Sequence, residues 1–197
     1  MVGMRKYIIT KALRCIDEVY PDDNDANGPH FPLEEFIDEA GRRVLLAAPL
    51  HVIPNRAALT ECVLRPHTDG SGEIDLPDDF LKLARLRMEG WQRPVLAAIP
   101  EEHPAARRQY HPVTRGGTAK PVVLLTHGGT RLRYFSVTEA QHRIAEGEYI
   151  AYTSLDDTYP ERLPTAWMLG ALVLGVANDA NGAKTAEARA MEILSAL

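Results

Sequence analysis

The sequence has few cysteines and no apolar run long enough to cross a membrane. Its two cysteines, Cys15 and Cys62, lie on unlike segments and lack C-x-x-C spacing, so we expect reduced thiols rather than a disulfide framework. The longest apolar run, Ala166–Ala177, is shorter than the about 20 residues that a transmembrane helix needs. Met1–Thr10 also lacks the apolar region of a signal peptide. The sequence therefore predicts a soluble, intracellular protein.

Acidic residues are missing from one long stretch, although the chain as a whole is acidic. Between His103 and Ser136 there are six Lys/Arg and no Asp/Glu. Residues 1–40 carry four Lys/Arg against nine Asp/Glu, and residues 146–197 carry three against eight. The net charge of −5 argues against a general attraction of the whole chain to nucleic acid. The pattern indicates a building block with surfaces of opposite charge, which favours assembly over catalysis.

The motifs of common enzymes and zinc sites are also missing. The seven histidines show no H-x-H, H-x-x-x-H or H-E-x-x-H pairing. Residues 126–130 contain the H-G-G letters of a hydrolase oxyanion hole, but Ser71 lacks the G-x-S-x-G turn that would present a nucleophile. A hairpin turn explains the two glycines by itself. We therefore predict no enzyme activity and no cofactor, and keep a small hydrolase using Ser71 and His127 as an alternative.

One acidic segment matches the calcium loop of an EF-hand. Residues 23–28, followed by Glu34, fit the pattern D-x-[DN]-x-[DN]-G-x5-E, in which side-chain oxygens surround the cation. Pro21 breaks the helix before this loop and the chain holds no second copy, so a solvated acidic connector is the competing interpretation. We predict no metal and keep calcium as an alternative, for which the ligands would be Asp23, Asp25, Asn27 and Glu34.

Helical spacing of apolar residues marks both ends of the chain. It predicts a helix over residues 5–19 and a second one that begins at Pro32 and ends by Pro49. Pro164 starts a third helix, which is apolar on nearly every face and is therefore expected to be buried on all sides. Residues 183–197 form the last helix.

The middle of the chain alternates short extended runs with turns. Two pairs of runs predict hairpins, one around the turn at residues 67–72 and one around Gly128-Gly129. A strand over residues 81–89 is expected to pair with a return strand over residues 93–99. The remaining strands are expected over residues 59–65, 73–76, 122–126, 131–136 and 149–153.

These elements together predict an α+β fold. Residues 1–50 and 160–197 would form a four-helix bundle. Residues 51–159 would form an inserted small antiparallel β domain, either a sheet or an open barrel.

The basic stretch is the candidate interaction site. Arginine interleaved with aromatic residues is typical both of protein interfaces and of nucleic-acid grooves. On a chain with acidic ends, contact with the acidic surface of a neighbouring subunit is one reading, and solvated charge and DNA backbone contact are the others. The candidate interface residues are Arg107, Arg108, Tyr110, Arg115, Lys120, Arg131 and Arg133.

Three short patterns resemble a known family. Residues 76–95 run L-P-D-D-F-L-K-L-A-R-L-R-M-E-G-W-Q-R-P-V, A-A-P-L-H at residues 47–51 follows the second helix, and Leu163-Pro164 opens the apolar helix. This combination resembles the head-to-tail connector (adaptor or ring) proteins of tailed bacteriophages, and is most similar to the ring proteins of crAss-like gut phages. Many connectors have a longer C-terminal tail than this chain, so docking is expected to rely on loops such as residues 103–121.

The resemblance implies a structural protein of the virion, made in the cytoplasm of the bacterial host and located in the phage neck. It implies a homo-oligomeric ring, typically of twelve copies, at the portal vertex between the portal protein and the next neck or tail ring protein. DNA would pass through its lumen during ejection without sequence recognition, and no membrane would be involved. The alternatives remain a calcium-stabilised module and a nucleic-acid-binding module.

Overall fold

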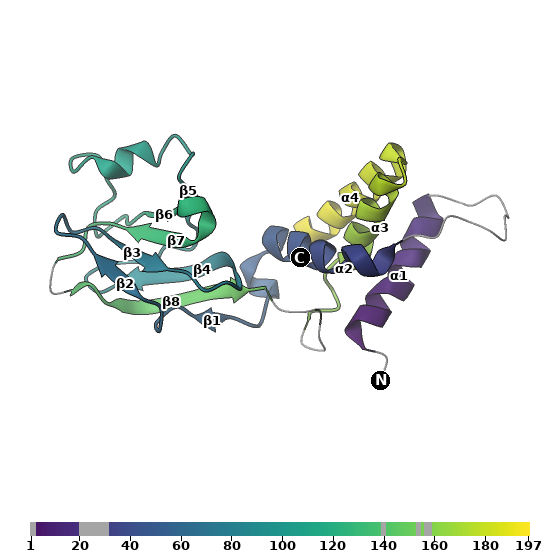
Figure 1. Cartoon of the computed structure of the whole chain (residues 1–197), viewed down its shortest axis with the longest axis horizontal. Helices are drawn as coiled ribbons and strands as arrows, with labels where there is room; N and C mark the ends of the chain where they lie inside the picture. Colours follow the sequence, from purple (N-terminus) through teal and green to yellow (C-terminus); the bar gives the residue numbers. More distant parts are fainter. Residues whose placement is uncertain (1–2, 20–31, 139–140, 153–154, 156–158) are drawn as a thin grey trace. The chain divides into compact units, whose positions relative to one another are not determined.

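The structure is a computed structural model and describes residues 3–19, 32–138, 141–152, 155 and 159–197. The chain divides into two compact units, drawn in Figure 1. The helical unit comprises Met1–Pro54 and Thr153–Leu197, and the β unit comprises Asn55–Tyr152. None of the helices in these described ranges is both long enough and apolar enough to span a membrane.

Within its described residues the helical unit contains four α-helices: α1 (Met4–Val19), α2 (Leu33–Ala47), α3 (Thr165–Val176) and α4 (Ala180–Ser195). Helix α3 begins directly after Pro164 and contains no charged residue, as the sequence predicts. Asn178 adopts a left-handed backbone with φ of 63° between α3 and α4, a conformation that asparagine tolerates better than most residues. The Asp179 side chain then caps α4 by accepting a hydrogen bond from the backbone N–H of Gly182 at 3.0 Å.

The predicted four-helix bundle is wrong, although the broad α+β class agrees with the structure. Helix α3 packs extensively against each of α1, α2 and α4, whereas α1 makes only small contacts with α2 and α4. A helix that is apolar all round needs neighbours on every side. Three helices surrounding a fourth do not share the common central core of a four-helix bundle. The arrangement therefore follows from the lack of a polar face on α3, most of whose residues are buried.

The described part of the β unit contains two sheets rather than the single sheet or open barrel that the sequence suggested (Figure 1). One sheet has three antiparallel strands in the order β1-β8-β4. The other has five strands in the order β2-β3-β7-β6-β5. The strands are β1 (Ala57–Ala58), β2 (Leu64–Pro66), β3 (Gly72–Asp75), β4 (Phe80–Met88), β5 (Ile99–Pro100), β6 (Val123–Thr126), β7 (Arg131–Tyr134) and β8 (Ile144–Ala151).

The two sheets share one hydrophobic core. Alternation along β7 places Leu132 and Tyr134 in this core, and Leu86 and Met88 of β4 join them from the other sheet. Both predicted hairpins form, β2 with β3 and β6 with β7, because their turn residues lie between strands that pair in register. The outer faces of the sheets carry the charged residues that alternate with the core positions.

One strand pairing differs from the sequence-based expectation and shapes the rest of the unit. Strand β4 pairs with β8, and the segment after β4 makes only an isolated bridge between Leu86 and Val95. Strand β5 instead pairs in parallel with β6, through Ile99 opposite Leu124. Parallel neighbours cannot be joined by a tight turn, so the chain needs a long crossover between them. Residues 101–122, the crossover segment, provide it.

Candidate interaction surface

The crossover segment packs on the outer face of the five-stranded sheet. In Figure 1 it appears as a loop with a short helix, standing off the strands near β5. That helix, η2 (Arg107–Tyr110), follows Ala106, which is fully buried and packs with Leu124 of β6 and Phe135 after β7. A small apolar cluster, separate from the main core of the β unit, therefore anchors the exposed part of the segment to the sheet.

Polar contacts hold the crossover segment in one conformation. The buried Gln109 accepts a hydrogen bond from the backbone N–H of Gly116 at 2.8 Å, and Ser136 donates to the carbonyl of Gly116 at 2.6 Å. The Thr114 hydroxyl donates to the carbonyl of Arg108 at 2.8 Å. These bonds join residues 108–116 of the loop to one another and to Ser136 just after β7, and so restrain the backbone of the segment.

Arg133 is clamped beneath the crossover segment. Its guanidinium lies 4.9 Å from the ring centroid of Tyr110 and 5.8 Å from that of Phe135, which are cation–π distances. The Tyr110 hydroxyl donates to Glu101 at 2.9 Å, and burial together with this hydrogen bond raises the pKa of Tyr110. Arg133 thus stabilises the fold of the segment rather than standing open to solvent.

Arg131 belongs to a ladder of charges across β2, β3 and β7. It donates to Glu73 at 3.0 Å and to Asp75 at 2.9 Å, and Asp75 also accepts from Arg65 at 2.7 Å. Glu73 lies directly opposite Arg133 in the strand register, with 3.9 Å between their charged groups. The hydrogen bond from Arg65 is the main cause that lowers the pKa of Asp75.

Arg115 is likewise bound within the chain. Its guanidinium donates to the carbonyl of Asp69 at 2.9 Å and lies 3.4 Å from the carboxylate of the same residue. The Ser71 hydroxyl donates to that carboxylate at 2.6 Å, and this hydrogen bond is the main cause that lowers the pKa of Asp69. Arg115 therefore ties the crossover segment to the turn between β2 and β3.

Four of the seven predicted interface residues are exposed and remain available for a partner: three basic residues and Tyr110. Arg107, Arg108 and Lys120 are exposed, and among the described residues no carboxylate pairs with them. Two apolar side chains accompany them on the crossover segment: Tyr110 is 44% exposed and Val113 is 85% exposed. The surface offered to a partner thus combines two adjacent arginines with apolar side chains on a rigid loop.

The structure does not bring together the two residues of the hydrolase alternative, Ser71 and His127. Ser71 is fully buried, with its hydroxyl bonded to Asp69 and 3.1 Å from the ring of His67, so a substrate cannot reach it as the hydrolase hypothesis requires. His127 is exposed in the β6–β7 turn, 3.5 Å from Glu73. The two residues do not form a nucleophile–base pair.

The calcium hypothesis falls mostly outside the described residues, since Asp23, Asp25 and Asn27 lie in 20–31. Glu34 is exposed in the first turn of α2, 4.0 Å from Arg5. Across the ranges that the structure describes, His, Cys, Asp and Glu form no cluster of three or more that could hold a metal ion.

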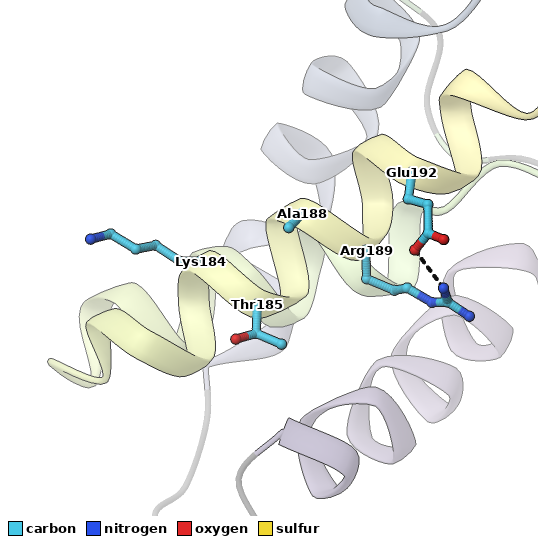
Figure 2. Close-up of a pocket in the computed structure, with 5 residues that line it drawn as sticks. All are labelled: Lys184, Thr185, Ala188, Arg189 and Glu192. Carbon is cyan, nitrogen blue, oxygen red and sulfur yellow. Dashed lines mark hydrogen bonds and ion pairs between the residues drawn. The ribbon is translucent and has the colours of Figure 1, made fainter.

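Two shallow hollows lie on the helical unit. The larger, of about 450 Å³, is lined by side chains of α4 alone and is shown in Figure 2. There Lys184 extends away from Thr185 and Ala188, while Arg189 turns to its ion pair with Glu192. The second, of about 230 Å³, lies on α1 between Tyr7 and Arg14. Neither brings together groups from several elements, as small-molecule sites generally do.

Sequence reasoning missed the carboxylates that neutralise part of the basic stretch. Glu73, Asp75 and Asp69 precede that stretch by tens of residues, and only the pairing of β3 with β7 and the contact of Arg115 with the β2–β3 turn bring them to it. The alternation of charged and apolar residues in β3 and in β7 was the signal in the sequence that could have indicated this pairing of charges. The chain matches no family model and no curated protein.

Proposed function

We propose that this chain is a structural subunit of the neck of a tailed-bacteriophage virion. It would form a homo-oligomeric ring at the portal vertex, bind the portal protein and the next ring protein along the axis, and let DNA pass through the lumen. Its role would be assembly, with no reaction catalysed.

The observation that carries the proposal is the contrast in charge between the two units. The helical unit has nine Lys/Arg against fifteen Asp/Glu, and the β unit has thirteen against twelve. The β unit also presents a hydrogen-bonded loop on which Arg107 and Arg108 have no carboxylate partner among the described residues. Two unlike surfaces on one chain favour head-to-tail contacts, which close into rings when the rotation per subunit permits.

The residues that resemble the connector family have structural roles compatible with such a building block. Phe80 stacks on Tyr149 of β8 with 5.6 Å between ring centroids, and Tyr149 donates to Asp79 at 2.9 Å. The L-P-D-D-F pattern therefore fixes the start of β4 against β8. Leu163 and Pro164 are buried at the start of α3.

Images of the concentrated protein test this function directly. Electron microscopy and sedimentation of the full chain over a wide concentration range should show closed rings of one size. A monomer at every concentration, or a symmetric dimer that associates no further, would contradict the proposal.

A nucleic-acid-binding module is the second candidate, because Arg107 and Arg108 lie beside the half-exposed Tyr110. Aromatic side chains next to arginine suit contact with bases and phosphates. Fluorescence anisotropy with short duplex and single-stranded DNA at low and high salt separates the two. The connector proposal expects weak binding, whereas tight, salt-sensitive binding that is lost in Arg107→Glu/Arg108→Glu would favour the second candidate.

A further inference from the structure

We infer that the crossover segment is the surface by which one copy of this chain binds the helical unit of a second copy, with Arg107 and Arg108 facing that unit's carboxylates. The inference rests on the proposed function and deepens it, since it names the contact that would repeat around the ring. The partner is a second copy of this chain, and the contacted surface is that copy's helical unit.

The crossover segment has two features of a binding surface: a restrained backbone and an exposed apolar side chain. Hydrogen bonds through Gln109, Thr114 and Ser136 fix its backbone, and the Arg133 stack fixes Tyr110. A loop that is already ordered loses little conformational entropy on association. Val113, 85% exposed, has no role in the core of its own chain.

Charge selects the helical unit as the partner. The β unit is almost balanced, and the outer faces of both its sheets carry ion-paired ladders, such as Arg87 with Glu146 at 2.7 Å. The helical unit has an excess of six acidic residues. Exposed carboxylates lie on three of its described helices: Asp17 on α1, Glu34 and Glu35 in the first turn of α2, and Glu187 on α4.

DNA is a poorer match for the same surface. Nonspecific DNA binders use several phosphate contacts, on the order of 6–10 in proteins with strongly salt-dependent affinity. Of the six basic residues between His103 and Ser136, Arg115, Arg131 and Arg133 have carboxylate partners within the chain. The two arginines that remain side by side, next to Tyr110 and Val113, resemble the arginine- and tyrosine-rich composition of protein interfaces.

The contact is heterologous because it joins a surface of the β unit to a different surface of the helical unit. Each copy that donates its crossover segment keeps its own helical unit open for another copy. Such a contact propagates around a ring.

Charge reversal tests the inference. Arg107→Glu/Arg108→Glu should weaken self-association in sedimentation by about tenfold or more, because like charges would then face each other across the contact. The control, Arg93→Glu/Arg143→Glu, changes the net charge equally at exposed positions outside the crossover segment and should leave association within about twofold of the unmodified chain. Trp91 fluorescence and circular dichroism confirm that each variant is folded.

Zero-length crosslinking identifies the partner surface. Arg107→Lys/Arg108→Lys keeps both charges and supplies amines that a carbodiimide joins to carboxylates in contact with them. The variant is mixed as isotope-labelled and unlabelled copies, so mass spectrometry separates links between copies from links within one. We expect links between copies that run from positions 107 and 108 to carboxylates of the helical unit.

The outcomes separate this inference from the proposed function. Rings that persist unchanged in Arg107→Glu/Arg108→Glu would overturn the inference and leave the ring proposal standing, as would links to the β unit only. Expected links without closed rings would support the inference and contradict the ring. Links within one copy only, with no association by the unmodified chain, would overturn both.

Discussion

Replacing Glu73 by Gln removes the carboxylate that bridges two arginines of β7 while keeping nearly the same shape. The Glu73 side chain is 9% exposed, and its partners Arg131 and Arg133 are 31% and 24% exposed. Removing one partner of a fully buried ion pair costs about 3–5 kcal/mol. An exposed pair contributes about 0–1 kcal/mol. Glu73 lies between these cases, and Arg131 keeps Asp75, so we expect a loss of about 2 kcal/mol in the free energy of unfolding, or about 30-fold in the folding equilibrium.

Glu146→Gln is the matched control. Glu146 also bridges two arginines, Arg85 and Arg87, but on the outer face of the other sheet, where its side chain is 36% exposed. Solvent screens this site more strongly, so the loss should be smaller than at Glu73. Urea unfolding monitored by Trp91, 3% exposed in the β core, in a Trp167→Phe background reports the β unit alone. Equal losses for the two variants, or a larger loss at Glu146, would refute the argument from burial.

Three further outcomes are expected. Gly72→Ala should destabilise the β unit by about 1–3 kcal/mol, because an added Cβ would clash with the hydroxyl and ring of the buried Tyr134. Gly117→Ala, with open space around it, should change the urea midpoint little. Leu169→Ala should lower the free energy of unfolding, monitored by Trp167, by about 2–5 kcal/mol, because Leu169 is fully buried in α3. A loss below about 1 kcal/mol would show that α3 is not the centre of its unit. Burial raises the pKa of Tyr134 and of Tyr149 to about 12, so the stability that their neutral forms contribute is complete below about pH 10 and lost as pH rises toward 12; urea midpoints that do not fall over this interval would contradict it.

Local signals in the sequence predicted most elements because their causes are local. The helix expected over residues 5–19 is α1, and the apolar run after Pro164 is α3. The hairpins form around turns whose glycines adopt positive φ, 75° at Gly70 and 92° at Gly129. Periodicity and turn chemistry act within about ten residues, so a single sequence records them.

The candidate surface depended on distant partners. Arg131 and Glu73 are 58 residues apart, and only the β3–β7 register makes one neutralise the other. The sequence treated all six basic residues as one stretch, whereas the fold uses Arg115, Arg131 and Arg133 internally and leaves Arg107 and Arg108 exposed. A ladder of cross-strand charges cannot be predicted until the strand order is known.

The sequence alone determined most of the elements, the opposite charge of ends and middle, and the burial of α3, because composition and periodicity carry that information. Tertiary structure decided that three helices surround α3 and that β5 pairs in parallel with β6. The parallel pairing requires the crossover segment, and the crossover segment places Arg107 and Arg108 at the surface. Side-chain patterns mark which residues are buried, whereas the geometry of packed elements selects their partners.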